Sequence, residues 1–315
     1  MQHPLNLIDS LTDPAVRDLA WVIGSPGLLE AGYPAYNNQV VDDAWCSAQF
    51  QAAAAWLAAL DLAPLPLHDF IAARPTRRLG HYFETLIAFW LRHLPDTLLI
   101  ATNLQVQHEQ RTVGEYDFLF RDAGASVCHW EAAVKFYLQL EPLTEQRAMI
   151  GPGTKDRLDL KLDRVFKHQL LLGSTAAGQQ ALPRGLLLNK TQAFIKGYLF
   201  YHASSSSPLP VQGVSASHLS GWWVRHAREK LPQKSAESRW LILPRLRWLA
   251  PVRLAADAEV MDYATLNNRL NQHFSLSGDA LLVFEISQKE TGVWQEISRG
   301  FVVCSSWPLL DEAGL

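Results

Sequence analysis

The chain of 315 residues contains only three cysteines, Cys46, Cys128 and Cys304. Their number is odd and no two have the spacing of a metal-binding pair, which argues against a disulfide framework and a zinc knuckle. The N-terminus lacks the basic segment and apolar run of a signal peptide. No uncharged apolar stretch reaches the roughly 18 residues that a membrane span requires. We therefore expect a reducing, cytoplasmic location.

Several familiar catalytic motifs are also missing. There is no Gly-x-Ser-x-Gly elbow, no P-loop, no dinucleotide fingerprint and no His-Glu-x-x-His pair. The net charge of −3 does not indicate a nucleic-acid-binding protein by itself. A hydrophobic content of 48% with 19% charged residues is that of an ordinary folded protein.

The charge is distributed unevenly along the C-terminal part. Residues 221–253 contain eight Lys or Arg and two acids, a local balance of +6, whereas residues 254–315 contain nine acids and three bases, or −6. This asymmetry indicates either a polyanion site or charge complementarity within the molecule. Four tryptophans interleave with the basic residues and suit either stacking on nucleic acid or core packing: Trp222, Trp223, Trp240 and Trp248.

The pattern of apolar residues predicts the order of elements. Residues 1–75 are expected to be mainly helical, and residues 76–94 form an amphipathic helix with Thr76 as its N-cap. Three strands follow, the last two joined as a hairpin, and then come a helix and a further strand. Their expected ranges are 98–106, 113–120 and 126–140 for the strands, 155–172 for the helix and 193–201 for the last strand.

The length exceeds what one small core needs. A polar linker at residues 204–208 is the best domain boundary. It is followed by an expected helix near 217–231, a strand near 240–243 and a hairpin of residues 280–286 and 293–303. We predict an α/β fold, a mixed central sheet flanked by helices, in three regions: an N-terminal helical layer (1–75), a core (76–202) and a C-terminal α+β extension (203–315).

Charged side chains occur on strands that otherwise have a buried character. Because side chains alternate along a strand, Glu131 and Lys135 share one face, and Asp117 on the hairpin partner can lie across from it. Unpaired buried charge is costly. Two carboxylates near one lysine can bind a divalent cation, and the lysine can orient a water or stabilise phosphorane charge.

This arrangement resembles the PD-(D/E)xK phosphodiesterase superfamily, which has a restriction-endonuclease-like core. The resemblance covers about residues 76–202 and rests on the element order, an acid in the first helix, Asp117 and the later acid and lysine. It implies a metal-dependent nuclease that uses Mg²⁺ or Mn²⁺ on DNA or RNA. The chain more closely resembles a bacterial family of unknown function often grouped with that superfamily, through residues 114–117, 131–137, 151–159 and 196–201.

Carried over by position, Asp117 is the first metal-binding carboxylate and Lys135 the catalytic lysine. The sequence departs from the pattern at Ala133, where the second acid is expected, because the available acid is Glu131. Glu131 keeps the correct face but is shifted by roughly 6–7 Å along the strand. Glu84 on the helix can assist in binding the metal, and Glu115 has the same strand parity as Asp117, which makes it a possible substitute ligand.

The helix expected at 155–172 offers two further candidates. Gln169 falls within its apolar stripe; some superfamily members direct a glutamine from this helix toward the active site, but a core glutamine is the alternative. Arg157, Lys161 and Arg164 form a basic row with His168 at helical spacing. The row can follow a phosphate backbone or be a solvated face with ion pairs.

Three functions remain open at this level. The first is a metal-dependent nuclease with Asp117, Glu131 and Glu84 at the metal and Lys135 beside the attacking water. The second is a nucleic-acid-binding module of the same fold in which Ala133 marks lost activity. The third is a protein-interaction scaffold, with Glu131 paired to Lys135 and Asp117 bracing the hairpin.

Overall fold

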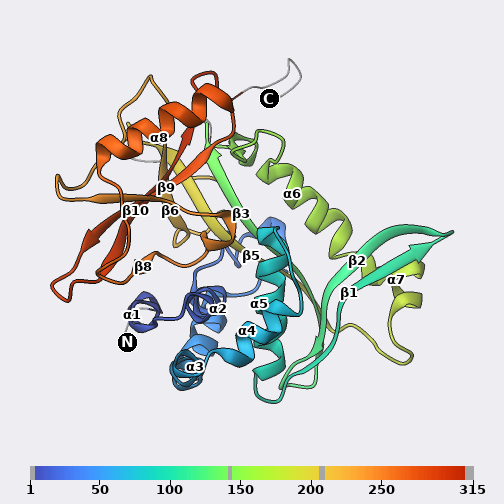
Figure 1. Ribbon diagram of the computed structural model, residues 1–315. Helices are drawn as coiled ribbons and strands as arrows, with labels where there is room; N and C mark the ends of the chain where they lie inside the picture. The colour runs from blue at the N-terminus through green and yellow to red at the C-terminus, as the bar shows by residue number, and fades with distance from the viewer. Residues whose placement is uncertain (1–3, 141–143, 206–209, 309–315) are drawn as a thin grey trace. The chain divides into compact units, whose positions relative to one another are not determined.

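The computed structural model describes residues 4–140, 144–205 and 210–308, which form α-helices and one large mixed sheet (Figure 1). The helices are α1 (Pro4–Ser10), α2 (Pro14–Gly24), α3 (Asp43–Leu62), α4 (Leu65–Ala72), α5 (Leu79–His93), α6 (Leu158–Arg164), α7 (Ala176–Ala181) and α8 (Tyr263–Leu276). The strands are β1 (Leu98–His108), β2 (Arg111–Arg121), β3 (Val127–Gln139), β4 (Met149–Ile150), β5 (Lys190–His202), β6 (Leu219–Arg225), β7 (Arg239–Ile242), β8 (Arg253–Leu254), β9 (Leu281–Gln288) and β10 (Trp294–Val303). The predicted α/β class, a mixed sheet flanked by helices, is confirmed.

The sheet follows the order β1-β2-β3-β5-β6-β10-β9-β7, with β4 beside β3 and β8 beside β10. The chain divides into two compact units. Unit 1 comprises Met1–Lys135, Leu160–Gly197 and Gly213–His218; unit 2 comprises Phe136–Asp159, Tyr198–Gln212 and Leu219–Leu315. Strands β3 and β5 run through both, and the linker expected at 204–208 lies partly outside the described residues. The three sequence regions remain a prediction.

The N-terminal part of unit 1 is helical, as predicted. Asp13 caps α2 by accepting hydrogen bonds from the backbone N–H groups of Ala15 and Val16, and α2 packs against α3 and α5. Asp42 caps α3 in the same way. In the described part of the chain no single helix is long and apolar enough to cross a membrane, and only the pair α3–α4, bent by 84°, meets that criterion when taken together.

Helix α5 has the apolar face that its spacing predicts, but Thr85–Leu91 are all buried, so this part of the helix is covered on every side. The predicted N-cap was wrong, because the helix begins two residues later than Thr76 suggests. Arg78 occupies the N-cap position without a capping side chain, and the hydroxyl of Thr76 accepts the backbone N–H of Arg78 at 3.0 Å. Thr76 therefore supports the turn that enters the helix.

The three predicted strands and their hairpin are confirmed. β1 and β2 pair antiparallel from Leu98↔Arg121 to His108↔Arg111. β2 and β3 pair antiparallel over a shorter stretch, from Phe118↔Trp130 to Arg121↔Val127. Figure 1 shows β1 and β2 continuing as a long two-stranded ribbon with α7 beside it. The ladder between β2 and β3 ends at Phe118↔Trp130. The polar residues beyond this pair do not take part in hydrogen bonds of that ladder.

A single helix over 155–172 was expected, and this prediction was wrong. The α-helix α6 ends at Arg164 and continues as a π-helical turn over Val165–Gln169, followed by a 3-10 turn over Leu172–Ser174. The wider π turn changes the direction of every side chain after Arg164. Such turns within helices occur often at functional sites.

Unit 2 contains the clearest error of secondary structure. The helix expected near 217–231 is the strand β6, which pairs parallel with β5 and with β10. Parallel strands are covered on both faces, so their apolar residues follow one another without the alternation that marks a half-exposed strand. Residues 222–224 form such a run, and both Trp223 and Val224 are buried.

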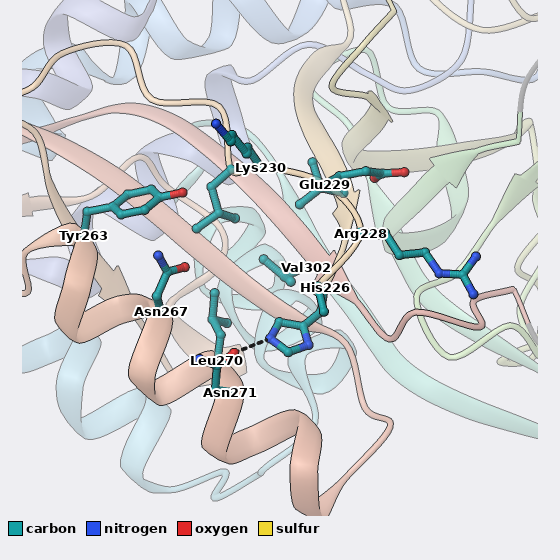
Figure 2. Close-up of a pocket in the computed structure, with 12 residues that line it drawn as sticks. His226, Arg228, Glu229, Lys230, Tyr263, Asn267, Leu270, Asn271 and Val302 are labelled. Carbon is teal, nitrogen blue, oxygen red and sulfur yellow. Dashed lines mark hydrogen bonds between the residues drawn. The ribbon is translucent and has the colours of Figure 1, made fainter.

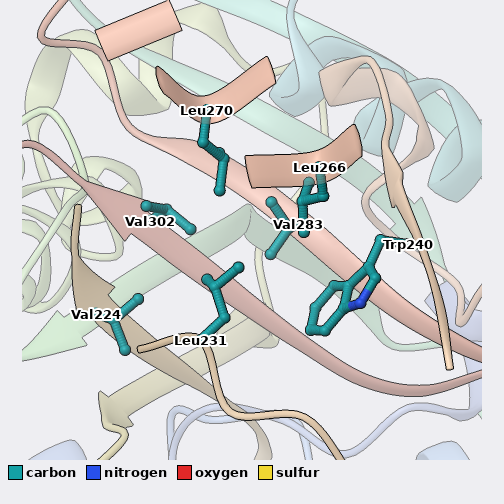
Figure 3. Close-up of a cluster of buried hydrophobic side chains, with 7 residues drawn as sticks. All are labelled: Val224, Leu231, Trp240, Leu266, Leu270, Val283 and Val302. Carbon is teal, nitrogen blue, oxygen red and sulfur yellow. The ribbon is translucent and has the colours of Figure 1, made fainter. Parts of the chain in front are cut away.

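The predicted strand near 240–243 and the C-terminal hairpin are confirmed as β7, β9 and β10. Helix α8 was not expected; Asp262 caps it by accepting the N–H of Thr265 at 2.7 Å. Leu266 and Leu270 anchor α8 on the sheet. They belong to a buried cluster, shown in Figure 3, that consists of Val224, Leu231, Trp240, Leu266, Leu270, Val283 and Val302.

Candidate functional site

Asp117 and Glu131 meet at the point where β2 and β3 separate. The last ladder pair is Phe118↔Trp130, and continuing that register by one residue places Asp117 opposite Glu131. Instead of a ladder bond, the Asp117 carboxylate accepts the backbone N–H of Ala132 at 2.9 Å. Both acids are buried, with 9% of Asp117 and 2% of Glu131 exposed. The structure thus brings together two carboxylates from neighbouring strands.

The burial of this pair changes its protonation. Loss of solvation and, to a lesser extent, the charge of Glu131 raise the pKa of Asp117 to about 8, although the hydrogen bond from Ala132 opposes the rise. Burial also raises the pKa of Glu131, opposed mainly by the charge of Lys161. The Oε2 atom of Glu131 is buried without a hydrogen-bond partner among the described residues. The two carboxyl groups therefore hold a proton between them unless a bound cation replaces it.

Lys161 and Gln169 approach the acid pair from α6 and the π turn. The Nζ atom of Lys161 lies 3.4 Å from Glu131 Oε1 and 3.4 Å from Gln169 Oε1. The side-chain amide of Gln169 donates to the same Glu131 oxygen. The amine in contact with Glu131 thus belongs to Lys161, a residue that the sequence pattern had placed only in the basic row.

Lys135 shares the strand parity of Glu131 and lies four residues further along β3, with a half-buried side chain. Ala133, at the position where the resemblance expects an acid, is also half-buried. The carboxylate that faces Asp117 is therefore supplied two residues earlier, by Glu131. This placement agrees with the parity argument made from the sequence.

Glu84 and Glu115 lie at the border of the site and are connected by Asn103. The side-chain amide of Asn103 is 3.3 Å from Glu84 Oε2 and 3.1 Å from Glu115 Oε1. His81 lies 3.3 Å from the same oxygen of Glu84. The charge of Glu84 contributes to the raised pKa of Asp117, which places it within electrostatic reach of the pair.

A groove of about 390 Å³ opens over Asp117. Glu115 and Asp117 line it from β2, and Arg164, His168 and Gln169 line it from α6 and the π turn. Arg157 of the predicted row instead forms a two-point ion pair with Asp159, at 2.9 and 2.6 Å. The four-residue basic row is thus not one continuous face, because Arg157 precedes α6 and His168 follows its α-helical part.

Two contributors to the site were missed or misplaced by sequence reasoning. Asn103 adopts a left-handed backbone (φ 51°) in β1, and its polar side chain in a strand was the available signal. Lys161 was recognised only for its charge, because its contact with Glu131 depends on tertiary packing. The four C-terminal tryptophans are buried or half-buried, which favours their core-packing interpretation.

Two carboxylate side chains are available at this site to bind a divalent metal ion. Asp117 and Glu131 supply buried carboxylates, and Glu131 Oε2 has no donor among the described residues. In the described part of the chain, however, no group of three or more His, Cys, Asp or Glu side chains is arranged to hold a metal ion. The pair is therefore suited to a cation whose remaining ligands are water or substrate oxygens.

Comparison with known proteins adds a family but no activity. No curated protein and no solved structure matches the chain. A family model described as a domain of unknown function, DUF1853, matches residues 17–303, which is most of the chain. The chain therefore belongs to the DUF1853 family.

Proposed function

We propose that the protein is a metal-dependent nuclease with a restriction-endonuclease-like core, and that Asp117 and Glu131 hold its Mg²⁺ or Mn²⁺. The observation that supports this proposal is the buried carboxylate pair at the point where β2 and β3 separate. Burial and the charge of a neighbouring acid raise the pKa of Asp117 to about 8. An acid in this environment lowers the stability of the folded protein, so stability does not explain its presence. A perturbed acid that lines a groove and lies beside a second buried acid is typical of functional sites.

The chemistry of the donors agrees with a hard divalent cation. Mg²⁺ and Mn²⁺ prefer oxygen ligands, and Mg²⁺ is commonly bound by one or two carboxylates together with waters and phosphate oxygens. When bound, such an ion supplies Lewis-acid activation of a phosphoryl oxygen and lowers the pKa of a coordinated water. In this proposal Glu84 and Glu115, which are connected through Asn103, bind the waters around the ion.

The other residues of the site position the substrate. Lys161 is assigned the role that the resemblance gives to the motif lysine, because its amine contacts Glu131. It stabilises charge that develops on the phosphate, and Gln169 orients both Glu131 and Lys161. Arg164 and His168, which line the groove, contact the phosphate backbone. Lys135, the lysine of the motif, lies four residues beyond Glu131 on the same face of β3.

A cleavage assay tests the proposal. Single-stranded and double-stranded DNA and RNA are incubated with the protein and Mg²⁺, Mn²⁺ or EDTA. We expect cleavage with the metals and none with EDTA, and a loss of at least a hundredfold in Asp117→Asn, Glu131→Gln and Lys161→Met, the range typical of charge-stabilising groups. The matched control is Asp122→Asn, which follows the end of the same strand and pairs with Lys190.

Two results would contradict the nuclease proposal. One is metal-dependent cleavage that survives unchanged in Asp117→Asn, because the activity would then come from a contaminant or another site. The other is the absence of cleavage of all four substrates by the folded protein in the presence of either metal. The second result favours the alternative function.

That alternative is a nucleic-acid-binding module without turnover, and one observation favours it. Lys161 already lies 3.4 Å from Glu131, so an ammonium group neutralises the acid that a metal would otherwise neutralise. Ala133 leaves the site without the expected acid at that position. The alternative predicts salt-dependent retention of nucleic acid and no binding of Mn²⁺ in wild type or in Asp117→Asn.

A further inference from the structure

Three arginines stand in the short segment that leads into helix α5. Residues 74–81 contain Arg74, Arg77 and Arg78 and no acid. All three side chains are exposed, and none forms an ion pair with another described residue. The first turn of α5 also has no acid, so the positive end of the helix dipole adds to their charge. The segment therefore presents concentrated positive charge without a counterion from the described chain.

Arg74 is held in place beside a second unpaired arginine. Its guanidinium lies 3.8 Å from the centroid of the Phe70 ring and donates to the Phe70 carbonyl at 3.1 Å. Arg92, near the end of α5, lies over the same ring at 5.0 Å. Two cations that share one ring repel each other, and a bound anion reduces that repulsion.

The arginine segment borders a cavity of about 360 Å³ in unit 1. The polar residues that line it from the segment and from α5 are Arg74, Thr76 and His81, and Thr102 and Asn103 line it from β1. Except for the half-buried Thr76, these side chains are exposed. Arginine, threonine and asparagine are among the side chains that contact phosphate oxygens in nucleic-acid complexes.

This cavity shares a border with the groove over Asp117. The Asn103 amide donates to Glu84 Oε2 at 3.3 Å and to Glu115 Oε1 at 3.1 Å. Glu84 lines the cavity, and Glu115 lines the groove. Because one asparagine side chain connects the two linings and both belong to unit 1, the cavity and the groove are neighbours.

Basic side chains border both spaces. Arg164 and His168 line the groove, and Arg74 and His81 line the cavity. Glu84 is the one acid among the residues that line the cavity, and its Oε2 atom lies 3.3 Å from His81 Nδ1. A strand with its reacting phosphate at the buried acid pair and its neighbouring phosphates at these cations matches this order of charges.

The exposed basic residues of unit 2 do not converge in this way. A cavity there lies between α8 and the loop of residues 226–231 (Figure 2). Asn271 Oδ1 on its border is engaged by His226 Nε2 at 2.9 Å, and Arg228 extends away from it. The arginine segment before α5 is therefore the better placed of the two basic surfaces to bind a polyanion.

We propose that Arg74, Arg77 and Arg78, together with the adjoining cavity, bind phosphates of the nucleic-acid strand on one side of the cleavage position. The inference rests on the proposed nuclease, which places the reacting phosphate at Asp117. The strand leaves the groove, passes Asn103 and enters the cavity, and its next phosphates contact the guanidinium groups. Guanidinium binds phosphate through charge and paired hydrogen bonds, so this contact adds affinity without a preference for base sequence.

Fluorescence anisotropy on the full chain tests the proposal. The probes are oligothymidylates of four and sixteen nucleotides and a duplex of sixteen base pairs, all in EDTA, so that the readout does not depend on cleavage. We expect wild type to bind the longer single strand more tightly. Its slope of log K against log salt should be larger in magnitude by about 2, because three further phosphates at about 0.7 each are contacted.

A double variant measures the contribution of the segment. Arg77→Gln combined with Arg78→Gln should lower the affinity for the sixteen-nucleotide strand at least tenfold at low salt and reduce the magnitude of its slope by about 1.4. The four-nucleotide strand should change less than twofold. The matched control is Arg121→Gln combined with Arg184→Gln, which removes two exposed arginines outside the linings of the cavity and the groove.

The duplex identifies the form of the substrate. A loss of duplex affinity at least as large as that of the single strand shows that the segment binds a strand within a duplex, and a loss confined to the single strand shows that it binds unpaired nucleic acid. Either result supports the phosphate site.

Three results overturn the proposal: no saturable binding of the sixteen-nucleotide strand or the duplex by wild type, losses in the double variant no larger than those in the control, or equal losses for the short and the long strand. The last result would make the segment an anion site separate from the groove. A protein that cleaves nucleic acid but shows any of these results refutes the phosphate site alone. A protein that cleaves nothing yet shows the length-dependent loss refutes turnover alone.

Discussion

At the scale of single residues, the burial of the Asp117 carboxylate is unfavourable for folding. It is therefore the feature that most needs a functional explanation. Its carboxylate is buried beside Glu131, and its compensation is one backbone N–H and the charge of Lys161 at a distance. An asparagine at this position would accept the same N–H without the electrostatic penalty. That the chain has an acid here is readily understood if a cation displaces the proton during function.

Asp117 makes stability depend on pH in an unusual direction. Its pKa is about 8 in the folded protein and near 3.8 when exposed, so between about pH 4 and 8 the folded state keeps a proton that the unfolded state releases. Stability must then fall as the pH rises, by up to about 1.4 kcal/mol per pH unit. Asp117→Asn should remove this slope and raise the melting temperature at pH 8 relative to wild type.

Urea titrations at pH 5 and pH 8 measure the effect. Asp122→Asn is the control of opposite sign. Burial raises the pKa of the Asp122 carboxyl, but the hydrogen bonds from Lys190 and from the backbone N–H of Ser126, together with the charge of Lys190, outweigh burial and lower that pKa. Its contribution is lost as the pH falls. An Asp117→Asn variant with the same pH slope as wild type would show that Asp117 is ionised in the folded protein.

Lys161 gives a second prediction at this scale. Lys161→Met removes the ammonium 3.4 Å from Glu131 and leaves that buried carboxylate without its ion pair. Without metal the variant should be less stable than wild type, and Mn²⁺ should stabilise it more than it stabilises wild type, because the ion replaces the lost charge. Thermal melts with and without Mn²⁺ measure both effects, and an equal shift in the two proteins would contradict the shared site.

At the scale of elements, strands and helices with clear periodicity were predictable from the sequence. Helix α5 was identified because its apolar residues recur about every 3.6 residues. Strands β1 to β3 were identified because turn signals bound their apolar segments. Strand β6 was mistaken for a helix, since residues 225–230 are good helix formers and a parallel strand lacks alternation. Helix α8 was missed because only Leu266 and Leu270 are buried in it.

The candidate site was only partly predictable for a related reason. The meeting of Asp117 and Glu131 follows from strand parity and hairpin pairing, which the sequence encodes locally. The contacts of Lys161 and Gln169 with Glu131 depend on the π turn at Val165–Gln169, and the distinction between π and α turns is not visible in the spacing of apolar residues. Asn103 adopts a left-handed backbone in β1, and the polar side chain within a strand was the one sequence signal that pointed to it.

Gly197 in β5 provides a test of how closely the strands pass. Its φ of +142° is unfavourable for other residues, and an added Cβ would lie 1.8 Å from the carbonyl oxygen of Lys135. Gly197→Ala should therefore destabilise the protein by several kcal/mol, as overpacking combined with backbone strain does. The matched control is Gly80→Ala in α5, where nothing lies within 4 Å; it should stabilise the helix by up to about 1 kcal/mol. Urea unfolding measures both, and a neutral Gly197→Ala would contradict the described strand contact.

At the scale of the whole molecule, the uneven charge is used largely within the structure. Arg225 binds Glu229 and the carbonyl of Trp307, and Arg299 is buried against Glu296 and two backbone carbonyls. Arg225 of the basic segment 221–253 thus serves local packing, as does Arg299 in the acidic segment 254–315. A net charge of −3 agrees with a protein that contacts few phosphates.

The salt dependence of nucleic-acid binding follows from this charge distribution. For a short strand that occupies only the groove, with Lys161, Arg164 and His168 as the principal contacts, the slope of log K against log salt should lie between about −1 and −3. Arg164→Gln should reduce its magnitude by about 1. Arg157→Gln should leave it unchanged, because Arg157 is engaged by Asp159. Fluorescence anisotropy at several salt concentrations measures the slope, and a larger effect of Arg157 would contradict the assignment.

The proposed nuclease function depends most directly on whether Asp117 and Glu131 bind a divalent cation together. Titration calorimetry with Mn²⁺ at pH 6.5 and pH 8, in buffers of different ionisation enthalpy, measures the affinity and the protons released. We predict one site in wild type with tighter binding at pH 8, release of about one proton at pH 6.5, and no binding in Asp117→Asn or Glu131→Gln. Mn²⁺ binding that is absent in wild type, or that persists in both variants, would contradict the metal site and with it the proposed nuclease.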